Sequence, residues 1–215
     1  MEINKTLENL RIDYQSESLD LKDCEKDPLK QFDKWLVESL KAECDEPNAF
    51  ILSTVKKDQP RSRVLLLKGI HNQQFIFYTN YQSSKGSELD QNSKVAMTFL
   101  WLPLQRQVRI EGVVNKVSEE TSNDYFQKRP RGSQLGAIAS PQSQRVESRE
   151  VLEKMFAETD SKFKNIEIIP RPSHWGGYGV TPTLVEFWQG RNNRMHDRIC
   201  YVKVGDSWEL QRLAP

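Results

Sequence analysis

Three cationic or titratable side chains stand at every second position near the end of the sequence. Arg194, His196 and Arg198 follow Trp188 within the run from Glu186 to Arg198. If this run is extended, the three side chains lie on one face of a strand. Such a face would bind an anionic or electron-rich ligand, and Trp188 would add an aromatic wall for a planar one. A solvated strand edge is the alternative, but an edge rarely needs a histidine and a tryptophan beside its arginines, so the pattern favours a binding site.

A second group of polar residues could bind phosphate. Arg63 falls on a predicted strand, Thr79 at the end of the next one, and Lys85 within Ser83-Ser84-Lys85-Gly86 at a predicted helix start. Free N–H groups at a helix N-terminus bind phosphate, and a lysine there opposes the helix dipole unless an anion lies nearby. The alternative is a surface lysine that tolerates a cost of about 0.3–1 kcal/mol, and the residues alone leave both interpretations open.

A third group surrounds a predicted helix end. Tyr125 and Arg129 are one helical turn apart on the same face, and Ser133 follows the break expected at Pro130. Together they could bind an anion. Taken alone, however, they are more typical of an ordinary helix C-terminus with favourably placed basic residues.

The hydrophobic pattern predicts the elements that would position these groups. Apolar residues recur at helical spacing from Pro28 to Glu43. Stretches rich in β-branched and aromatic residues predict strands over 49–55, 61–70, 74–79, 94–101, 107–117, 179–188, 198–204 and 207–213. Further helices are predicted over 85–91, 118–127 and 148–163. Helices inserted between antiparallel strands, without regular alternation, indicate an α+β fold with a barrel-like sheet.

Composition narrows the functional classes. The 215 residues contain no Gly/Ser-rich or Pro-rich linker, so we expect one domain, and 31 basic against 30 acidic residues argue against a nucleic-acid or membrane surface. Cys24, Cys44 and Cys200 form no Cys-x-x-Cys pair, which indicates reduced thiols in a cytoplasmic protein. The three histidines are too scattered to suggest a metal site, and neither a secretory signal nor a membrane-spanning run is apparent.

Eight sequence blocks, in order over nearly the full chain, resemble the pyridoxamine 5'-phosphate oxidase family. Besides Glu186–Arg198, they are Arg63–Lys68, Phe77–Asn80, Arg106–Arg109, Tyr125–Ser133, Pro141–Ser143, Ser173–Gly177 and Arg212–Pro215. The resemblance implies an FMN-binding split β-barrel of antiparallel strands with flanking helices. It implies one domain over residues 1–215, with residues 1–27 as a mobile N-terminal arm, and a homodimer with active sites at the interface.

The resemblance also implies an activity. The family oxidises pyridoxamine 5'-phosphate and pyridoxine 5'-phosphate to pyridoxal 5'-phosphate, with FMN as cofactor and O2 as electron acceptor. Because the flavin is the electron sink, much of the rate should come from holding the substrate ring against it. The protein would then need groups that position its ligands more than nucleophiles, and the sequence indeed shows no Ser-His-Asp order.

The matching positions carry over the binding roles of the family. FMN would be held by Arg63, Val64, Leu67, Lys68, Tyr78, Thr79, Ser84, Lys85, Gln107, Gln142, Ser143, Trp188 and Arg198. The substrate would be held by Arg11, Tyr14, Lys68, Tyr125, Arg129, Ser133, Arg194 and His196, with Arg194 and His196 as the catalytic pair. Arg63 and Lys68 would point to opposite faces of an ideal strand, so a bulge or different ligands for the two must be assumed. Ser84 stands where the family often has arginine, which predicts weaker FMN binding.

Three other functions are alternatives. Another flavin oxidoreductase of the split-barrel superfamily would keep the phosphate-binding half but need not keep Tyr125, Arg129, Ser133 and the Arg194/His196 pair, which are all present. A non-catalytic FMN or pyridoxal phosphate carrier would tolerate loss of His196. A plain interaction domain explains none of the paired cationic sites.

Overall fold

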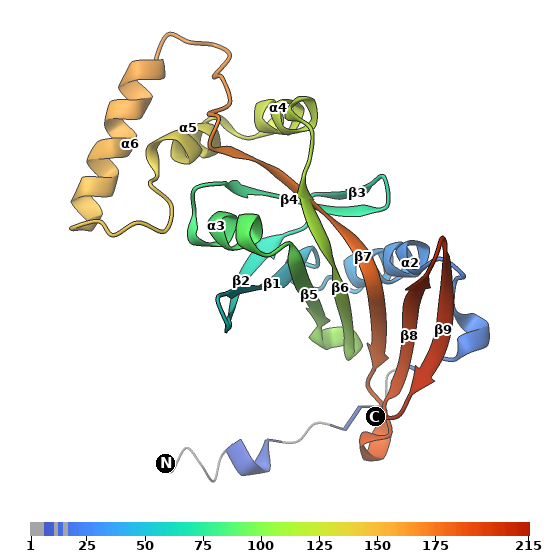
Figure 1. Cartoon of the computed structure of the whole chain (residues 1–215). Coiled ribbons are helices and arrows are strands. Elements are labelled where there is room, and N and C mark those ends of the chain that lie inside the picture. Colours follow the sequence, from blue (N-terminus) through green and yellow to red (C-terminus); the bar gives the residue numbers. More distant parts are fainter. Residues whose placement is uncertain (1–6, 11–12, 15–16) are drawn as a thin grey trace. The chain divides into compact units, whose positions relative to one another are not determined.

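The computed structural model describes residues 7–10, 13–14 and 17–215. They divide into two units, each made from distant parts of the chain (Figure 1). Unit 1 contains the described residues up to Phe50 together with 97–111 and 182–215, and unit 2 contains 51–96 and 112–181. Within the described ranges, no helix is long and apolar enough to cross a membrane.

In the described part of the chain, nine strands pair in the order β2-β1-β5-β6-β7-β4-β3, with β8 added to β7 and β9 to β8. Their bounds are β1 (Ala49–Lys56), β2 (Gln59–Leu66), β3 (Gly69–His71), β4 (Gln74–Asn80), β5 (Lys94–Trp101), β6 (Arg106–Lys116), β7 (Trp175–Gln189), β8 (Asp197–Val204) and β9 (Ser207–Leu213). The long strand β7 pairs antiparallel with β4 along its first half and with β8 along its second. Strands β1, β5, β6 and β7 each contribute residues to both units.

The described helices are α2 (Pro28–Lys41), α3 (Ser84–Gln91), α4 (Glu119–Lys128), α5 (Arg131–Ala139) and α6 (Arg149–Phe163), with short 3-10 turns at η1 (Leu21–Asp23), η2 (Leu102–Leu104) and η3 (Asn192–Arg194). A side chain caps the start of α2, α3 and α4, but not that of α5 or α6. Asp27 Oδ1 accepts a 2.9 Å hydrogen bond from Leu29 N–H, and Pro28 occupies the first turn, where its missing N–H is not needed. Ser83 and Ser118 cap α3 and α4 in the same way.

Unit 1 has an aromatic core beneath α2. The ring of Phe32 packs 4.8 Å from that of Phe99, and the ring of Trp35 packs 5.1 Å from that of Phe187, both edge to face. All four side chains are almost fully buried. Burial of a large apolar side chain contributes about 1.5–3 kcal/mol, so this face fixes α2 within the unit.

Unit 2 has a separate apolar cluster that orders its helices. Phe126 of α4, Leu135 of α5 and Phe163 of α6 pack with Ile169 and with Trp175 at the start of β7. Helices α5 and α6 lie side by side in this unit (Figure 1). The cluster therefore positions α5 next to the beginning of β7.

The α+β class and the antiparallel pairing are confirmed, and each predicted strand is present, with 61–70 divided between β2 and β3. Helix α5 was not expected from the sequence. The extended conformation expected from Arg194 to Arg198 is wrong, because Asn192–Arg194 form a 3-10 turn and β8 begins only at Asp197. Asn193 and Arg194 have φ values of 55° and 61°, a left-handed conformation that asparagine favours. Arg194, His196 and Arg198 therefore do not share one strand face.

Helix α5 carries two glycines, Gly132 and Gly136, one turn apart. Neither has a positive φ, and a Cβ added at either would meet nothing within 4 Å. A glycine in a helix interior costs about 1 kcal/mol relative to alanine. Neither the backbone conformation nor the packing within the described chain requires these glycines.

Candidate active site

Lys85 is the centre of a polar cluster in unit 2. The residue is only 8% exposed, and its Nζ lies 3.2 Å from Thr79 Oγ1, 3.3 Å from Gln142 Oε1 and 3.4 Å from Ser83 Oγ. All three partners are uncharged. Burial lowers the pKa of Lys85, and the charge of Arg63 lowers it further. A bound anion would stabilise an ammonium group in this position.

The start of α3 brings Lys85 into the cluster. Ser83 Oγ accepts a 3.3 Å hydrogen bond from Gly86 N–H, which confirms the helix start expected from the sequence. A Cβ on residue 86 would lie 2.0 Å from the carbonyl oxygen of Tyr81, so the chain can enter the helix this tightly only with glycine. Ser84 is exposed at the N-terminus of α3, where free backbone N–H groups are suited to a phosphate.

Glu88 holds Arg63 in the same unit. Glu88 is 1% exposed, its Oε2 lies 2.8 Å from Arg63 Nη2, and it accepts a 2.6 Å hydrogen bond from Thr54 Oγ1. Burial raises the pKa of Glu88, but the hydrogen bonds from Thr54 and Arg63 and the charges of Arg63 and Arg61 outweigh it, so the pKa is lowered overall. Arg63 is therefore an oriented cation, already paired with one carboxylate.

Lys68 lies between two strands and not within one. Strand β2 ends at Leu66 and β3 begins at Gly69, while Lys68 N–H donates a 2.8 Å hydrogen bond to the carbonyl of Ile76. The alternation of a continuous strand therefore does not relate Arg63 to Lys68. Lys68 is exposed. Of the two apolar residues predicted to contact FMN, Val64 is exposed and Leu67 is buried.

Tyr125, Arg129 and Ser133 meet around the buried ring of Trp175. The guanidinium carbon of Arg129 lies 4.4 Å from the Trp175 ring centre, and Arg129 Nη2 donates a 2.9 Å hydrogen bond to the carbonyl of Ser133. Arg129 does not share a helical face with Tyr125 as expected, because it is the extended residue that ends α4. The Tyr125 ring stacks on Tyr78 at 3.9 Å, and burial, with the nearby tyrosine and acidic charges, raises the pKa of Tyr78 to about 12.

Gln142 joins this group to the Lys85 cluster. A pocket of about 310 Å³ is lined by Asn80, Arg129, Ser133, Gly136, Ala137, Ser140, Gln142 and Trp175. The same Gln142 side chain accepts hydrogen bonds from Lys85 and from Thr79, the latter at 3.1 Å. Its neighbour Ser143 is exposed with a φ of 71°. In unit 2, Gln142 thus contacts Lys85 and Thr79, which are predicted to bind FMN. It also lines the pocket of Arg129 and Ser133, which are predicted to bind the substrate.

A pocket of about 490 Å³ in unit 1 contains the predicted catalytic pair. It is lined by Leu10, Asp13, Tyr14, Trp188, Arg191, Asn193, Arg194 and His196. The ring of His196 lies 4.6 Å from that of Trp188, and the ring of Tyr14 packs against both at 5.6 Å and 5.7 Å. Arg11, the other residue predicted in the arm, lies outside the described residues.

The hydrogen bonding of His196 defines its neutral form. Its Nδ1 lies 3.1 Å from the backbone N–H of Arg191, which can only donate, so the neutral ring carries its proton on Nε2. Burial lowers the pKa of His196, and the charge of Arg194 lowers it further. The neutral imidazole therefore offers an Nε2–H donor to the pocket.

Arg198 is neutralised, contrary to the expectation from the sequence. It lies opposite Trp188 in the β7–β8 pair, and its Nε lies 2.8 Å from Oε1 of the buried Glu186. The hydrogen bond from Arg198 to this carboxylate raises the pKa of the arginine. Gln107 is half-buried on β6, outside the residues that line the unit 1 pocket.

Comparisons with known proteins identify the family of the chain. The family model described as "Pyridoxamine 5'-phosphate oxidase" matches residues 36–163, and the one described as "Pyridoxine 5'-phosphate oxidase C-terminal dimerisation region" matches residues 175–215. The chain belongs to the pyridoxamine 5'-phosphate oxidase family. The second match contains Trp188, Arg194, His196 and Arg198.

Relatives of this oxidase family match along nearly the whole chain. The pyridoxine/pyridoxamine 5'-phosphate oxidase of Acaryochloris marina is 49% identical over 211 residues, covering 98% of this chain and 96% of that protein. That of Salinibacter ruber is 50% identical over 213 residues, covering 97% and 99%. Among solved structures, PhzG from Burkholderia lata in complex with tetrahydrophenazine-1-carboxylic acid aligns with a TM-score of 0.86 and 27% identity, covering 94% of this chain and 100% of PhzG.

The split-barrel class expected from the sequence is confirmed by structural relatives of the oxidase family. A pyridoxamine 5'-phosphate oxidase-related, FMN binding protein from Nostoc punctiforme shares the fold with a TM-score of 0.71 at 16% identity, covering 89% of this chain and 100% of that one. FMN carries a phosphate. The buried Lys85, with uncharged oxygens around it and the N-terminus of α3 beside it, is suited to that group.

Three residues of this oxidase family member were not expected from the sequence to shape the site. Glu88 follows Lys85 by one helical turn, which was the available signal for its place in the cluster. Trp175 and Arg106 both fall in the blocks that resemble the family. The guanidinium of Arg106 lies 4.4 Å from the Trp35 ring and hydrogen-bonds Gln189 Oε1 at 2.8 Å.

Arg106 fixes the described end of the expected N-terminal arm within unit 1. Its two terminal nitrogens form ion pairs with Glu17 and with Glu38 of α2. The side chain of Arg106 is only 5% exposed, but those of Glu17 and Glu38 are 59% and 35% exposed, so solvent weakens both ion pairs. Glu17 is only three residues from Tyr14, so these ion pairs fix the chain close to that tyrosine.

A glycine on the adjacent strand end makes room for Tyr14. A Cβ added to Gly190 would lie 2.8 Å from Tyr14 Cγ, so Gly190→Ala should push the tyrosine ring away from Trp188 and His196. We expect the apparent KM for pyridoxamine 5'-phosphate to rise about tenfold in steady-state assays. Tyr14→Ala should show a similar rise, and the double variant should be no worse than Tyr14→Ala alone. An additive loss in the double variant would contradict a role of Gly190 through Tyr14.

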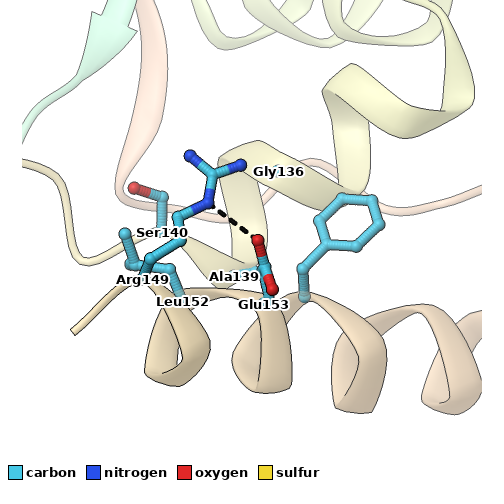
Figure 2. Close-up of a pocket in the computed structure, with 7 residues that line it drawn as sticks. Gly136, Ala139, Ser140, Arg149, Leu152 and Glu153 are labelled. Atoms are coloured by element: carbon cyan, nitrogen blue, oxygen red, sulfur yellow. Dashed lines mark hydrogen bonds and ion pairs between the residues drawn. The ribbon is translucent and has the colours of Figure 1, made fainter.

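A larger groove in unit 2, about 530 Å³, lies between α5 and α6. Figure 2 shows Gly136, Ala139 and Ser140 on the α5 side and Arg149, Leu152 and Glu153 on α6. Arg149 Nε and Glu153 Oε1 form a 2.9 Å ion pair, but both side chains are mostly exposed, which makes the pair weak. None of the predicted site residues lines this groove, so it is not the candidate active site.

Proposed function

We propose that this protein is an FMN-dependent oxidase that converts pyridoxamine 5'-phosphate and pyridoxine 5'-phosphate to pyridoxal 5'-phosphate. The observation that carries the proposal is Gln142, which touches the buried Lys85 and lines the pocket of Arg129 and Ser133. A superfamily relative with another substrate would need only the first of these two anion-binding groups. Full-length relatives named pyridoxine/pyridoxamine 5'-phosphate oxidase support the assignment.

The reaction balances as a two-electron oxidation at the 4' carbon. The substrate loses two electrons and two protons, and the electron pair reduces O2 to H2O2. With the amine substrate, water supplies the aldehyde oxygen and the nitrogen leaves as ammonia. When bound, FMN supplies the electron acceptor on which this chemistry depends.

The residues of the chain bind and orient the two ligands. Lys85 and Thr79 hold the phosphate of FMN, while Arg129 and Ser133 hold that of the substrate. Arg194 and His196 contact the pyridine ring and its reacting substituent, where His196 donates a hydrogen bond through Nε2–H. Holding two reactants at the right distance supplies much of such a rate.

We further propose a cytoplasmic homodimer in which residues of the dimerisation region complete the site of the other subunit. The match to that region includes the predicted catalytic pair, Arg194 and His196, which supports this arrangement. Cys44 and Cys200 are free and buried thiols, in keeping with a reducing compartment. Sedimentation of the FMN-loaded protein would test the dimer.

The experiment that tests the activity is anaerobic mixing of the FMN-loaded protein with each vitamer, followed by the visible absorbance of the flavin. Bleaching with either vitamer, reversed when air is admitted, is the expected result. Flavin that stays oxidised with both would favour a split-barrel relative with another substrate or a carrier. Protein that binds no FMN would overturn the proposal.

The pH dependence of the reaction should follow His196. Because its pKa lies below the ordinary value near 6.5, the ring is neutral at pH 7. As the pH falls through the lowered pKa, protonation of Nδ1 breaks the hydrogen bond from Arg191 and changes the orientation of the ring. We therefore expect kcat/KM to decline on the acid side only below about pH 6.5, the ordinary pKa of histidine. His196→Gln keeps an N–H donor without a titrating group, so it should retain activity and lose this decline; an unchanged acid decline would contradict the assignment.

A further inference from the structure

We infer that Gly136 is a specificity-determining residue that leaves room for the substrate beside Arg129 and Ser133. The inference rests on the proposed function. It starts from a helix whose two glycines are required neither by a positive φ nor by a neighbouring atom. A ligand that is not part of the described chain would explain why glycine, with its low helix propensity, occupies such a position.

The two glycines differ in what surrounds them. Gly136 is half-buried and lines the pocket formed with Arg129, Ser133, Gln142 and Trp175, whereas Gly132 is exposed and lines neither that pocket nor the neighbouring groove. Gly136 also borders the groove between α5 and α6, where Figure 2 shows it on the α5 ribbon. A side chain at position 136 would project into open space beside one or both hollows.

The chemistry of the two hollows decides which ligand Gly136 serves. The groove offers one exposed ion pair and apolar side chains, Leu152 and Phe156. The pocket offers the guanidinium of Arg129, held over the buried Trp175 ring. Ser133 lies one helical turn before Gly136, so both belong to the same side of α5. A phosphorylated planar ring anchored at Arg129 and Ser133 would extend past Gly136.

The test compares the two glycines with the same substitutions. Gly136→Ala should raise the KM for pyridoxamine 5'-phosphate about tenfold, and Gly136→Leu should raise it further, while the Kd for FMN stays unchanged. Gly132→Ala and Gly132→Leu are the matched controls and should leave KM unchanged. Gly136→Ala should raise Tm by about 2–4 °C, because Gly136 is in the interior of α5, and this would show that any loss at position 136 is not a loss of folding.

Other outcomes distinguish a failure of the inference about Gly136 from a failure of the proposed function. An unchanged KM in both Gly136 variants, or an equal rise in the Gly132 variants, overturns the inference. A weaker Kd for FMN with an unchanged KM also overturns it, because Gly136 would then serve the cofactor. If the unaltered protein oxidises neither vitamer, the proposed function fails. A titration with pyridoxal 5'-phosphate then decides the inference separately: weaker binding only in the Gly136 variants supports it, and equal binding in all variants overturns it.

Discussion

Replacing Lys85 by methionine is expected to raise the Kd for FMN about 30-fold or more while the apoprotein stays folded. In the described chain, the buried ammonium has only uncharged hydrogen-bond partners, and the charge of Glu88 does not fully offset its burial, so the phosphate of FMN would stabilise it further. Because burial lowers the pKa of Lys85, its charged form costs the folded apoprotein stability at neutral pH. Methionine removes that cost and fills a similar volume. The Tm of the apoprotein should therefore stay the same or rise.

The measurement is a titration of apoprotein with FMN, followed by the quenching of flavin fluorescence. Lys116→Met is the matched control, since it removes the same charge from unit 2. Lys116 Nζ lies 3.2 Å from Asp90 Oδ1 and 4.7 Å from the Tyr81 ring centre, outside the Lys85 cluster. We expect this variant to bind FMN normally. Equal affinity for FMN in the Lys85 variant and the unaltered protein would show that the cluster is not the phosphate site.

The sequence predicted most of the elements because helix caps and strand patterns depend on residues that are close together in the chain. Ser83 and Ser118 cap helices at the positions expected from their own side-chain chemistry. Helix α5 escaped prediction because Pro130 reads as an end and two glycines weaken the helical signal that follows. Its stability comes instead from Leu135, which packs into the apolar cluster of unit 2. Tertiary packing of that kind has no counterpart in a short window of sequence.

In the candidate site, too, local features could be predicted from the sequence, but contacts between distant residues could not. The alternation of Arg194, His196 and Arg198 suggested a strand, whereas Asn192 and Asn193 were the better signal, since such residues favour turns. The pairing of Arg198 with Glu186 depends on the register of β7 against β8, which alternation alone does not give. Family resemblance supplied the candidate residues, but only the structure placed Gln142 against both Lys85 and the pocket of Arg129.

Replacing Arg194 by alanine is expected to lower kcat/KM for pyridoxamine 5'-phosphate about 100-fold with little change in the Kd for FMN. Arg194 is exposed at the unit 1 pocket, and no described carboxylate forms an ion pair with it. Its guanidinium is therefore available to a ligand. Its left-handed φ of 61° is a conformation that non-glycine residues seldom adopt, and the turn holds the side chain beside His196.

The contrast with Arg198 makes the Arg194 prediction specific. Both are cations of the same segment, but Arg198 is paired with Glu186, which is 3% exposed and also lies 3.0 Å from Arg109. Removing Arg198 leaves this buried carboxylate with one fewer partner, so Arg198→Ala should lower Tm. Arg194→Ala breaks no such pair, so its Tm should be unchanged while turnover falls. Stopped-flow flavin reduction and thermal unfolding of both variants would decide the matter: a parallel loss of FMN and turnover in Arg194→Ala would assign Arg194 to the cofactor instead of the substrate.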